Sequence, residues 1–277
     1  MEPTPAFPRA GDTGAPLTAT VLLAPGCSLL ALSLLTEPWR IANRLAGRPA
    51  ADWQVTSPDG APVTATNGMT LPVEAGAAAA RPAALVIVVA GERPDRIVTP
   101  ALRHWLRGQA AAGRLLAGVD TGVEALAAAG LLGDHAPTIH PEARSAFEER
   151  HLGLGLSLGL YTMGERRATC AGGLATLDFS LALLARFAGS ALAERTAEAL
   201  LHARRIGELQ ALPEGAGRWR DPRLDRALRY LGQAAFGGDC TSAAVARAAG
   251  LSERQLARLM RAGVGTSVAG AVRRLRI

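Results

Sequence analysis

The chain has 277 residues, 49% of them hydrophobic, which is enough for one sizeable core and a small second domain. All thirty basic residues are Arg, and with 24 acidic residues they give a formal net charge of +6. The three cysteines lie far apart, and none belongs to a CxxC motif or to a His/Cys cluster. This composition argues against a disulfide framework and a zinc module. We expect a reduced, cytoplasmic protein without a metal or cofactor.

The charge is distributed unevenly along the chain. Residues 1–201 carry a net charge of −2, residues 202–220 carry +2, and residues 221–277 carry +6. A basic terminal segment on a nearly neutral body is typical of a protein that binds a polyanion such as DNA. An Arg-rich helical face in contact with solvent would give the same count, so charge alone leaves both interpretations open.

The first 35 residues raise the question of a membrane segment. Residues 1–16 contain four prolines and are interpreted as a disordered tail. Residues 17–35 are uncharged and just long enough to span a bilayer, but Pro25 and Gly26 interrupt them and no basic segment precedes them. A buried strand, a turn and the start of an apolar helix fit better, so we expect no membrane span.

Strand-like and helix-like segments alternate over residues 17–204. Short apolar or β-branched runs predict strands at residues 21–24, 53–57, 63–66, 71–73, 84–90 and 115–119. Helical spacing predicts helices at residues 28–45, 100–112, 121–129, 177–187 and 191–204. Residues 153–160 are assigned to a strand or loop. The alternation predicts a three-layer α/β sandwich with a mostly parallel sheet.

The last quarter of the chain has a different pattern. Residues 205–222 lack apolar periodicity and contain Gly, Pro and charged residues, so we expect a linker between domains of residues 17–204 and 223–277. Residues 224–233 are predicted to form a helix. A short helix at residues 242–249, a turn at Gly250 and a second helix capped by Ser252 follow. Its buried stripe is predicted to be Leu256, Leu259 and Met260.

This second helix has polar side chains on its outer face. In a helix-turn-helix, the first residues of the second helix reach base edges, while flanking cations hold phosphates. Arg254 and Gln255 are therefore candidates for base contacts. The candidates for phosphate contacts are Arg258, Arg261, Arg273 and Arg274, and Ser252 at the start of the helix is also predicted to bind DNA. An ordinary hairpin of two helices with a polar face would show the same pattern.

Residues 243–277, AAVARAAGLSERQLARLMRAGVGTSVAGAVRRLRI, resemble the first helix-turn-helix of AraC-type transcription regulators. The matching positions include Ala249-Gly250, Ser252, Arg254, Leu256 and Arg258, whereas Met260, Val268 and Ala271 replace the usual Phe, Pro and Tyr. In that family a second helix-turn-helix follows. The resemblance therefore implies an incomplete module, either in a fragment or in a chain that binds DNA weakly or not at all, because phosphate contacts are lost.

The motif Gly118-Val119-Asp120-Thr121-Gly122 lies between a predicted strand and a predicted helix. Such an elbow places Asp120 at the carboxyl end of the sheet, where ligand sites of α/β proteins form. Asp120 would equally well cap the helix that follows, and both roles are compatible.

Residues 17–202 resemble the PfpI-type, glutamine-amidotransferase-like domain, a flavodoxin-like fold. The resemblance rests on SPDGAPVTATNG, LAGVDTGVEALAAAGLL, the TIH sequence ending at His140, and RRATCAGGLATLDFSLALLAR. Joined to an AraC-type module, this domain is similar to GlxA-like regulators, and within these to regulators of choline, carnitine, glycine betaine or arginine catabolism. In the fold the elbow residue is a nucleophilic Cys, so Asp120 implies a domain without thiol chemistry.

The resemblance also implies a ligand site. Glu37 matches a pocket acid of the fold, and His140 matches the partner of the nucleophile. With Asp120, Thr121 and Trp39 these residues would hold a small cation, because quaternary ammonium groups favour aromatic faces and nearby negative charge. As structural residues, Trp39 would instead belong to the core and His140 would be hydrogen-bonded locally.

We therefore expect a homodimeric, DNA-binding transcription regulator, not an enzyme, that responds to a small metabolite such as a quaternary amine or an amino acid derivative. One alternative is an enzyme of the same fold, a hydrolase or a glyoxalase-like protein. It would need a nucleophile at the elbow that Asp120 does not provide. The other is a truncated ligand sensor that does not bind DNA.

Overall fold

A computed structural model describes residues 16–92, 98–133, 135–202, 222–234, 239–264 and 266–275. Nearly all of the expected N-terminal tail and of the expected linker lies outside these residues. Among the described helices, none combines the length and the apolar character needed to cross a membrane.

The larger part of the structure is built on a seven-stranded sheet in the order β5-β2-β1-β6-β7-β9-β8. All neighbouring strands are parallel except β8 and β9. The strands are β1 (Leu17–Leu23), β2 (Ala51–Ser57), β5 (Ala75–Gly76), β6 (Leu85–Val89), β7 (Leu115–Val119), β8 (Tyr161–Met163) and β9 (Arg167–Cys170). Every residue of β6 and β7 is buried, as expected for central parallel strands covered on both faces.

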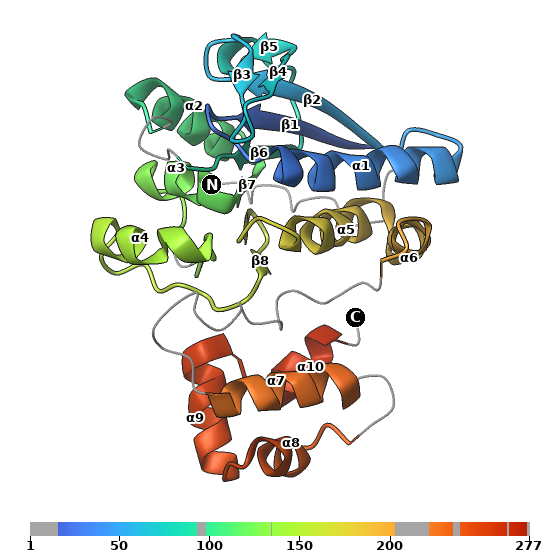
Figure 1. Ribbon diagram of the computed structural model, residues 1–277, viewed down its shortest axis with the longest axis vertical. Helices are drawn as coiled ribbons and strands as arrows, with labels where there is room; N and C mark the ends of the chain where they lie inside the picture. Colours follow the sequence, from blue (N-terminus) through green and yellow to red (C-terminus); the bar gives the residue numbers. More distant parts are fainter. Residues whose placement is uncertain are drawn as a thin grey trace, which may run out of the picture.

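Helices cover both faces of this sheet, and the sheet divides the hydrophobic core in two (Figure 1). In β6, Leu85, Ile87 and Val89 pack with helices α1, α5 and α6, whereas Val86 and Val88 pack with α2, α3 and α4. The predicted three-layer, flavodoxin-like sandwich is confirmed. The helices are α1 (Leu29–Ala46), α2 (Pro100–Ala111), α3 (Val123–Ala128), α4 (Arg144–Arg150), α5 (Ala175–Ala188) and α6 (Ser190–Ala199).

The ends of α1 follow directly from the sequence. The Ser28 hydroxyl accepts a hydrogen bond from the backbone N–H of Ala31 (3.2 Å), and Gly47 ends the helix in the left-handed conformation (φ 63°). A small hairpin of β3 (Val63–Thr64) and β4 (Thr70–Leu71) also forms as predicted.

Three strands, one helix start and one helix end differ from the sequence predictions; the helix predicted at residues 191–204 ends at Ala199. The short strands β5, β8 and β9 were not predicted. In the case of β9, the buried side chains are all small or polar and there is no apolar run. The helix predicted at residues 121–129 starts instead with a 3₁₀ turn over Asp120–Gly122, and α3 follows from Val123. Residues 153–158 contain no strand or helix.

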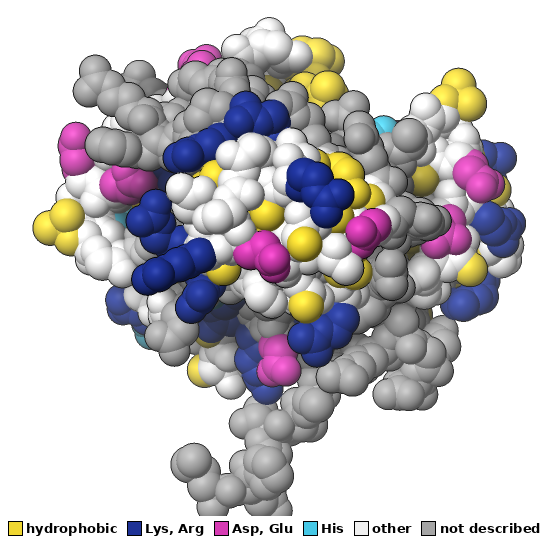
Figure 2. Space-filling view, turned by 90° about the horizontal axis from the view of Figure 1, so that it is seen from below, with side chains coloured by type: hydrophobic (Ala, Val, Ile, Leu, Met, Phe, Trp, Pro, Cys, Tyr) yellow, Lys and Arg dark blue, Asp and Glu magenta, His cyan; other side chains and the backbone are white. Residues whose placement is uncertain are grey.

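The C-terminal helices have a separate hydrophobic core. They are α7 (Pro222–Ala234), α8 (Ser242–Ala249), α9 (Glu253–Val264) and α10 (Val268–Leu275). Gly250 ends α8 with φ 67°, and in α9 Leu256 and Met260 are fully buried while Leu259 is partly buried. The predicted helix, turn and second helix are confirmed. Figure 2 views the molecule from this end and shows Arg side chains gathered along one side of the face.

The turn after β7 depends on glycine at position 122. A Cβ atom there would lie 2.1 Å from the carbonyl oxygen of Val88, a backbone atom of the central strand. We expect Gly122→Ala to lower the free energy of unfolding by about 1–3 kcal/mol, because neither backbone can yield without displacing the strand. Urea unfolding followed by circular dichroism measures this change.

The matched control is Gly108→Ala in α2, where an added Cβ meets open space. This change is expected to raise the free energy of unfolding by about 0.5–1 kcal/mol, because alanine loses less conformational freedom than glycine in a helix. Equal effects of the two substitutions would contradict the packing account of the turn.

Candidate functional site

Asp120 lies at the point where β7 turns into α3. Its φ is 60°, a left-handed conformation that is uncommon for residues other than glycine and tends to occur at functional sites. The side chain packs so closely on the neighbouring loop that a Cβ atom on Gly172 would come within 2.9 Å of it. The carboxylate accepts a hydrogen bond from the backbone N–H of Thr121, but no side chain caps α3 itself. The elbow conformation therefore holds the carboxylate in place.

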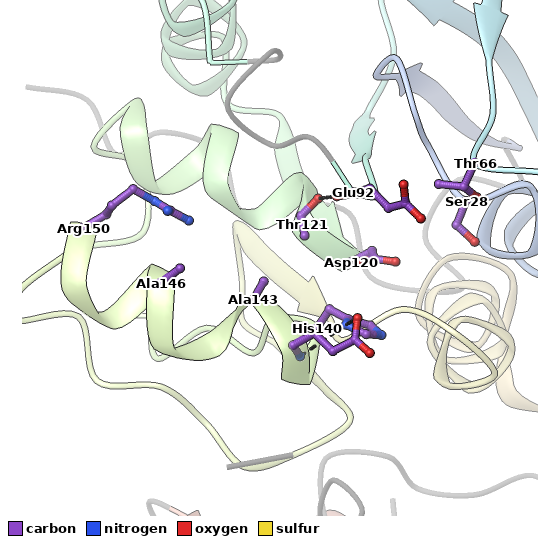
Figure 3. A pocket seen from close by; sticks show the side chains of 11 residues that line it. Ser28, Thr66, Glu92, Asp120, Thr121, His140, Ala143, Ala146 and Arg150 are labelled. Carbon is purple, nitrogen blue, oxygen red and sulfur yellow. Dashed lines mark hydrogen bonds and ion pairs between the residues drawn. The ribbon is translucent and has the colours of Figure 1, made fainter. Parts of the chain in front are cut away.

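Asp120 faces a cavity of about 470 Å³, a size typical of sites for small molecules (Figure 3). The cavity lies beyond the carboxyl ends of β1, β6 and β7. From β1 the chain crosses to β2 on one side, and from β6 it crosses to β7 on the other side. The cavity therefore lies at the topological switch point of the sheet, between β1 and β6. Its lining comprises Ser28, Thr66, Gly91, Glu92, Asp120, Thr121, His140, Glu142, Ala143, Ala146 and Arg150.

Three of the five predicted ligand residues line this cavity. Asp120 and Thr121 come from the elbow, and His140 comes from the segment before α4. The Thr121 hydroxyl donates to the carbonyl oxygen of Gly91 (2.5 Å), which ties the elbow to the end of β6. The Nδ1 atom of His140 accepts from the backbone N–H of Glu142 (3.4 Å), so the local hydrogen bond expected for a structural histidine is present beside the cavity.

Burial has the largest effect on the pKa of the carboxyl group at the elbow. Burial raises the pKa of Asp120 to about 6; the nearby His140 charge and the Thr121 backbone N–H oppose this shift, and the charge of Glu142 adds to it. Burial also raises the pKa of Cys170, behind the elbow, to about 12, and that of Cys27 to about 11. Neither thiol is a ready nucleophile at neutral pH.

Glu37 and Trp39 do not line the cavity, and their assignment to the ligand site needs correction. Glu37 lies on the solvent side of α1, where its carboxylate accepts from Arg40 (2.8 Å) and this bond lowers its pKa. Trp39 is fully buried against Trp53, with ring centroids 5.8 Å apart. The cavity receives only Ser28 from the start of α1, since the rest of the helix runs along the sheet away from the elbow.

Sequence reasoning missed several polar residues of the lining. Glu92 follows the buried strand β6 after Ala90 and Gly91, so the carboxyl-end rule that selected Asp120 also selects Glu92. Arg150 lies at the end of α4 and reaches the cavity only because α4 packs beside α3, a tertiary contact without a local signal. Within the described part of the chain, no three His, Cys, Asp or Glu side chains could hold a metal ion.

The predicted DNA-contacting residues lie on the helix-turn-helix surface. Arg254, Gln255, Arg258 and Arg261 are exposed on α9, and Arg273 is exposed on α10. The Arg274 side chain is outside the described residues. Ser252 and Gln255 form a capping box: the Gln255 backbone N–H donates to the Ser252 hydroxyl (3.3 Å), and the side-chain Oε1 of Gln255 accepts from the Ser252 backbone N–H (3.0 Å). The Gln255 amide nitrogen is not used in this box.

Comparisons with known proteins agree with the fold and with the joined modules. The model of the DJ-1/PfpI family matches residues 19–177. The HTH-type transcriptional regulator CdhR of Pseudomonas aeruginosa is 41% identical over 177 residues, which cover 64% of this chain and 52% of CdhR. The HTH-type transcriptional regulator GlxA of Rhizobium meliloti is 32% identical over 261 residues, covering 92% of this chain and 80% of GlxA. The chain thus matches only about half the length of CdhR.

Solved structures show the same fold. An AraC family transcriptional regulator from Pseudomonas putida superposes with a TM-score of 0.62 at 28% identity, covering 67% of this chain and all of that structure. DJ-1beta of Drosophila melanogaster superposes with a TM-score of 0.58 at 18% identity, over 68% of this chain, and this likeness concerns the fold alone.

The raised pKa of Asp120 makes stability depend on pH. The folded state binds this proton more tightly than the unfolded state, in which the pKa is 3.8. The resulting stabilisation is complete below that value and is lost as the pH rises through about 6. Asp120→Asn removes the titration, and asparagine also tolerates a left-handed backbone.

Between about pH 4 and about pH 8 the wild type loses this stabilisation and Asp120→Asn does not. We therefore expect the free energy of unfolding of the variant, relative to wild type, to rise by about 1–3 kcal/mol over this range. Urea unfolding of both proteins at several pH values measures the difference. A difference that stays constant with pH would show that the pKa of Asp120 is not raised.

Proposed function

The chain belongs to the DJ-1/PfpI family, and we propose that it is a DNA-binding transcription regulator that senses a small metabolite. We assign residues 17–204 to the sensor domain, 205–222 to the linker and 223–277 to the helix-turn-helix domain. The observation that carries the proposal is one chain that joins a carboxylate-lined cavity to an Arg-bearing helix-turn-helix. The alignment with GlxA, which spans 92% of the chain, supports reading both parts together.

A regulatory role of the α/β domain is supported by the chemistry of its elbow. Asp120 stands where an enzyme of this type would need a thiol, and the buried thiols of Cys27 and Cys170 are held protonated. The relatives CdhR and GlxA are named as transcriptional regulators, although the fold also includes enzymes. We infer a cytoplasmic, non-enzymatic protein that works as a homodimer, as closed symmetric assemblies commonly do.

The effector is inferred from the charge of the cavity. Glu92, Asp120 and Glu142 place three carboxylates around the elbow, so an effector with a cationic group would offset the desolvation of Asp120. Quaternary amines and amino acid derivatives carry such a group. The described lining contains no Phe, Tyr or Trp, so recognition would rest on charge and hydrogen bonds rather than on an aromatic cage.

A packed route leads from the elbow to the end of the sensor domain. Asp120 packs on Gly172, and the turn of Gly172 and Gly173 leads into α5. The buried Asp178 of α5 lies 2.9 Å from Nε2 of His202, the last described residue before the proposed linker. An effector that favours one position of Asp120 would shift this route between two arrangements and so change the DNA-binding state.

The DNA-binding part of the proposal predicts salt-dependent binding. We expect the affinity for DNA from upstream of the gene to fall steeply between about 50 and 200 mM salt, because phosphate contacts release counterions. Arg258→Gln should weaken binding to all sequences and reduce the slope of the log–log salt plot by about one. Arg254→Gln should mainly reduce the preference for the specific sequence, by about 1–3 kcal/mol. Fluorescence anisotropy measures both effects.

Arg40→Gln is the control, because Arg40 is an exposed arginine of α1, remote from the helix-turn-helix in the chain. Its DNA binding should equal that of the wild type. A salt slope near zero for the wild-type protein would rule out phosphate-based binding and would favour the alternative of a ligand sensor that does not bind DNA.

A further inference from the structure

The wall of the cavity formed by α4 contains a buried charged cluster that the proposed function does not use. The side chain of Glu124, on α3, is 4% exposed, and both of its carboxylate oxygens have partners. Arg150 donates to Oε1, and Nε2 of His151 lies 2.8 Å from Oε2. A carboxylate buried this deeply is tolerated only with such compensation, so Glu124 fixes the position of both partners.

The cluster directs Arg150 toward the cavity. The Arg150 side chain is 49% exposed and lines the cavity, while one of its terminal nitrogens is bonded to Glu124. Glu124 is the one side chain among the described residues that is hydrogen-bonded to this guanidinium. The other donors of the planar group are therefore available to a bound molecule.

The surrounding packing holds this arrangement in place. The His151 ring contacts the ring of Phe147, with centroids 4.6 Å apart, and Phe147 is fully buried in the core beneath α4. The end of α4 is therefore anchored by an apolar contact as well as by Glu124. A guanidinium oriented before the ligand arrives loses less conformational freedom on binding.

The charges of the cavity are separated along its length. Figure 3 shows Arg150 toward one end, whereas Asp120, Glu92 and His140 lie toward the other. Ala143 and Ala146, on the α4 side between these ends, are small and leave the path open. A molecule that spans the cavity would place one of its groups near the carboxylates of Asp120 and Glu92 and another near the guanidinium of Arg150.

We propose that Arg150, oriented by Glu124, binds a carboxylate of the effector whose cationic group lies toward Asp120 and Glu92. A planar guanidinium matches a carboxylate with two parallel hydrogen bonds, which favours it over a hydroxyl or an amide. This subsite makes the cavity selective for zwitterions over simple cations. The inference rests on the proposed effector site, but it does not depend on DNA binding.

Matched pairs of probes test the subsite directly. Arginine and agmatine differ by one carboxylate, and glycine betaine and choline differ by a carboxylate in place of a hydroxymethyl group. Isothermal titration calorimetry on the full chain should show that, in at least one pair, the carboxylated probe binds about tenfold tighter or more, as expected for a charge-assisted bidentate contact. Arg150→Gln should abolish this difference and leave the affinity for agmatine or choline unchanged.

Two further variants separate binding from folding. Arg150→Gln leaves the buried Glu124 with His151 alone, which destabilises the fold. The double variant with Glu124→Gln removes that buried charge and should recover the melting temperature while still failing to select the carboxylated probe. Glu124→Gln alone keeps the Arg150 charge without its orienting partner, so its selectivity should be intermediate. Arg40→Gln, at an exposed Arg–Glu pair outside the cavity, should behave as the wild type.

Several results would overturn the inference. These are equal affinities within both pairs, an equal loss for both members of a pair in Arg150→Gln, or no binding of either carboxylated probe. Inorganic phosphate that binds more tightly than acetate, in an Arg150-dependent manner, would assign the subsite to a phosphate ester instead. Failure of DNA binding in the anisotropy experiment, with carboxylate selectivity intact, would remove the proposed function and leave this subsite standing.

Discussion

The backbone at Asp120 is the constraint on which the rest of the site depends. A left-handed residue between a buried strand and a helix can exist here only because Gly122 passes within contact distance of the Val88 carbonyl and Gly172 makes room for the Asp120 side chain. The hydrogen bond from Thr121 to Gly91 then joins this elbow to the end of the neighbouring strand. Together these contacts place a carboxylate at the switch point of the sheet, where the strand ends leave a cavity.

A partly buried carboxylate gives this fold a different chemistry from a thiol. Burial works against the charged form of Asp120 and Glu142 adds to that effect, while the His140 charge opposes it; the net result is a carboxyl group with a pKa raised to about 6. A cationic group bound in the cavity would stabilise the charged form of Asp120. Binding would thereby be linked to the stability of the elbow. The buried Glu124 at the α4 wall has the opposite character, because Arg150 and His151 already compensate it. The cavity thus combines an acidic end, where burial disfavours the charged form of Asp120, with a basic end, where Glu124 orients Arg150.

Sequence reasoning recovered those features that local physics determines. The apolar runs of β6 and β7, the span of α1 and the buried stripe of α9 all follow from hydrophobic periodicity. The elbow was found as well, because a strand followed by a Gly-flanked acid has a recognisable pattern. Strand β9 escaped notice because its buried residues are small or polar and its pairing partners lie far away in the chain.

The composition of the site was predicted less well than its location. Glu37 and Trp39 were selected by position in a motif, but the faces of α1 send one to solvent and the other into the core. Arg150 could not be selected at all, since its place depends on how α4 packs against α3 and on the buried Glu124. Tertiary packing, rather than local pattern, decides which charges meet in this cavity.

The central claim is that occupancy of the cavity changes the DNA-binding state, and thermodynamic linkage tests it most directly. The affinity of the full chain for its upstream DNA should be measured by anisotropy with and without saturating arginine, glycine betaine or carnitine, whichever binds by calorimetry. The account predicts a change of about five-fold or more with the effector, the reciprocal change in effector affinity when DNA is bound, and loss of both in Asp120→Asn. An effector that binds the cavity but leaves the DNA affinity unchanged would contradict the account.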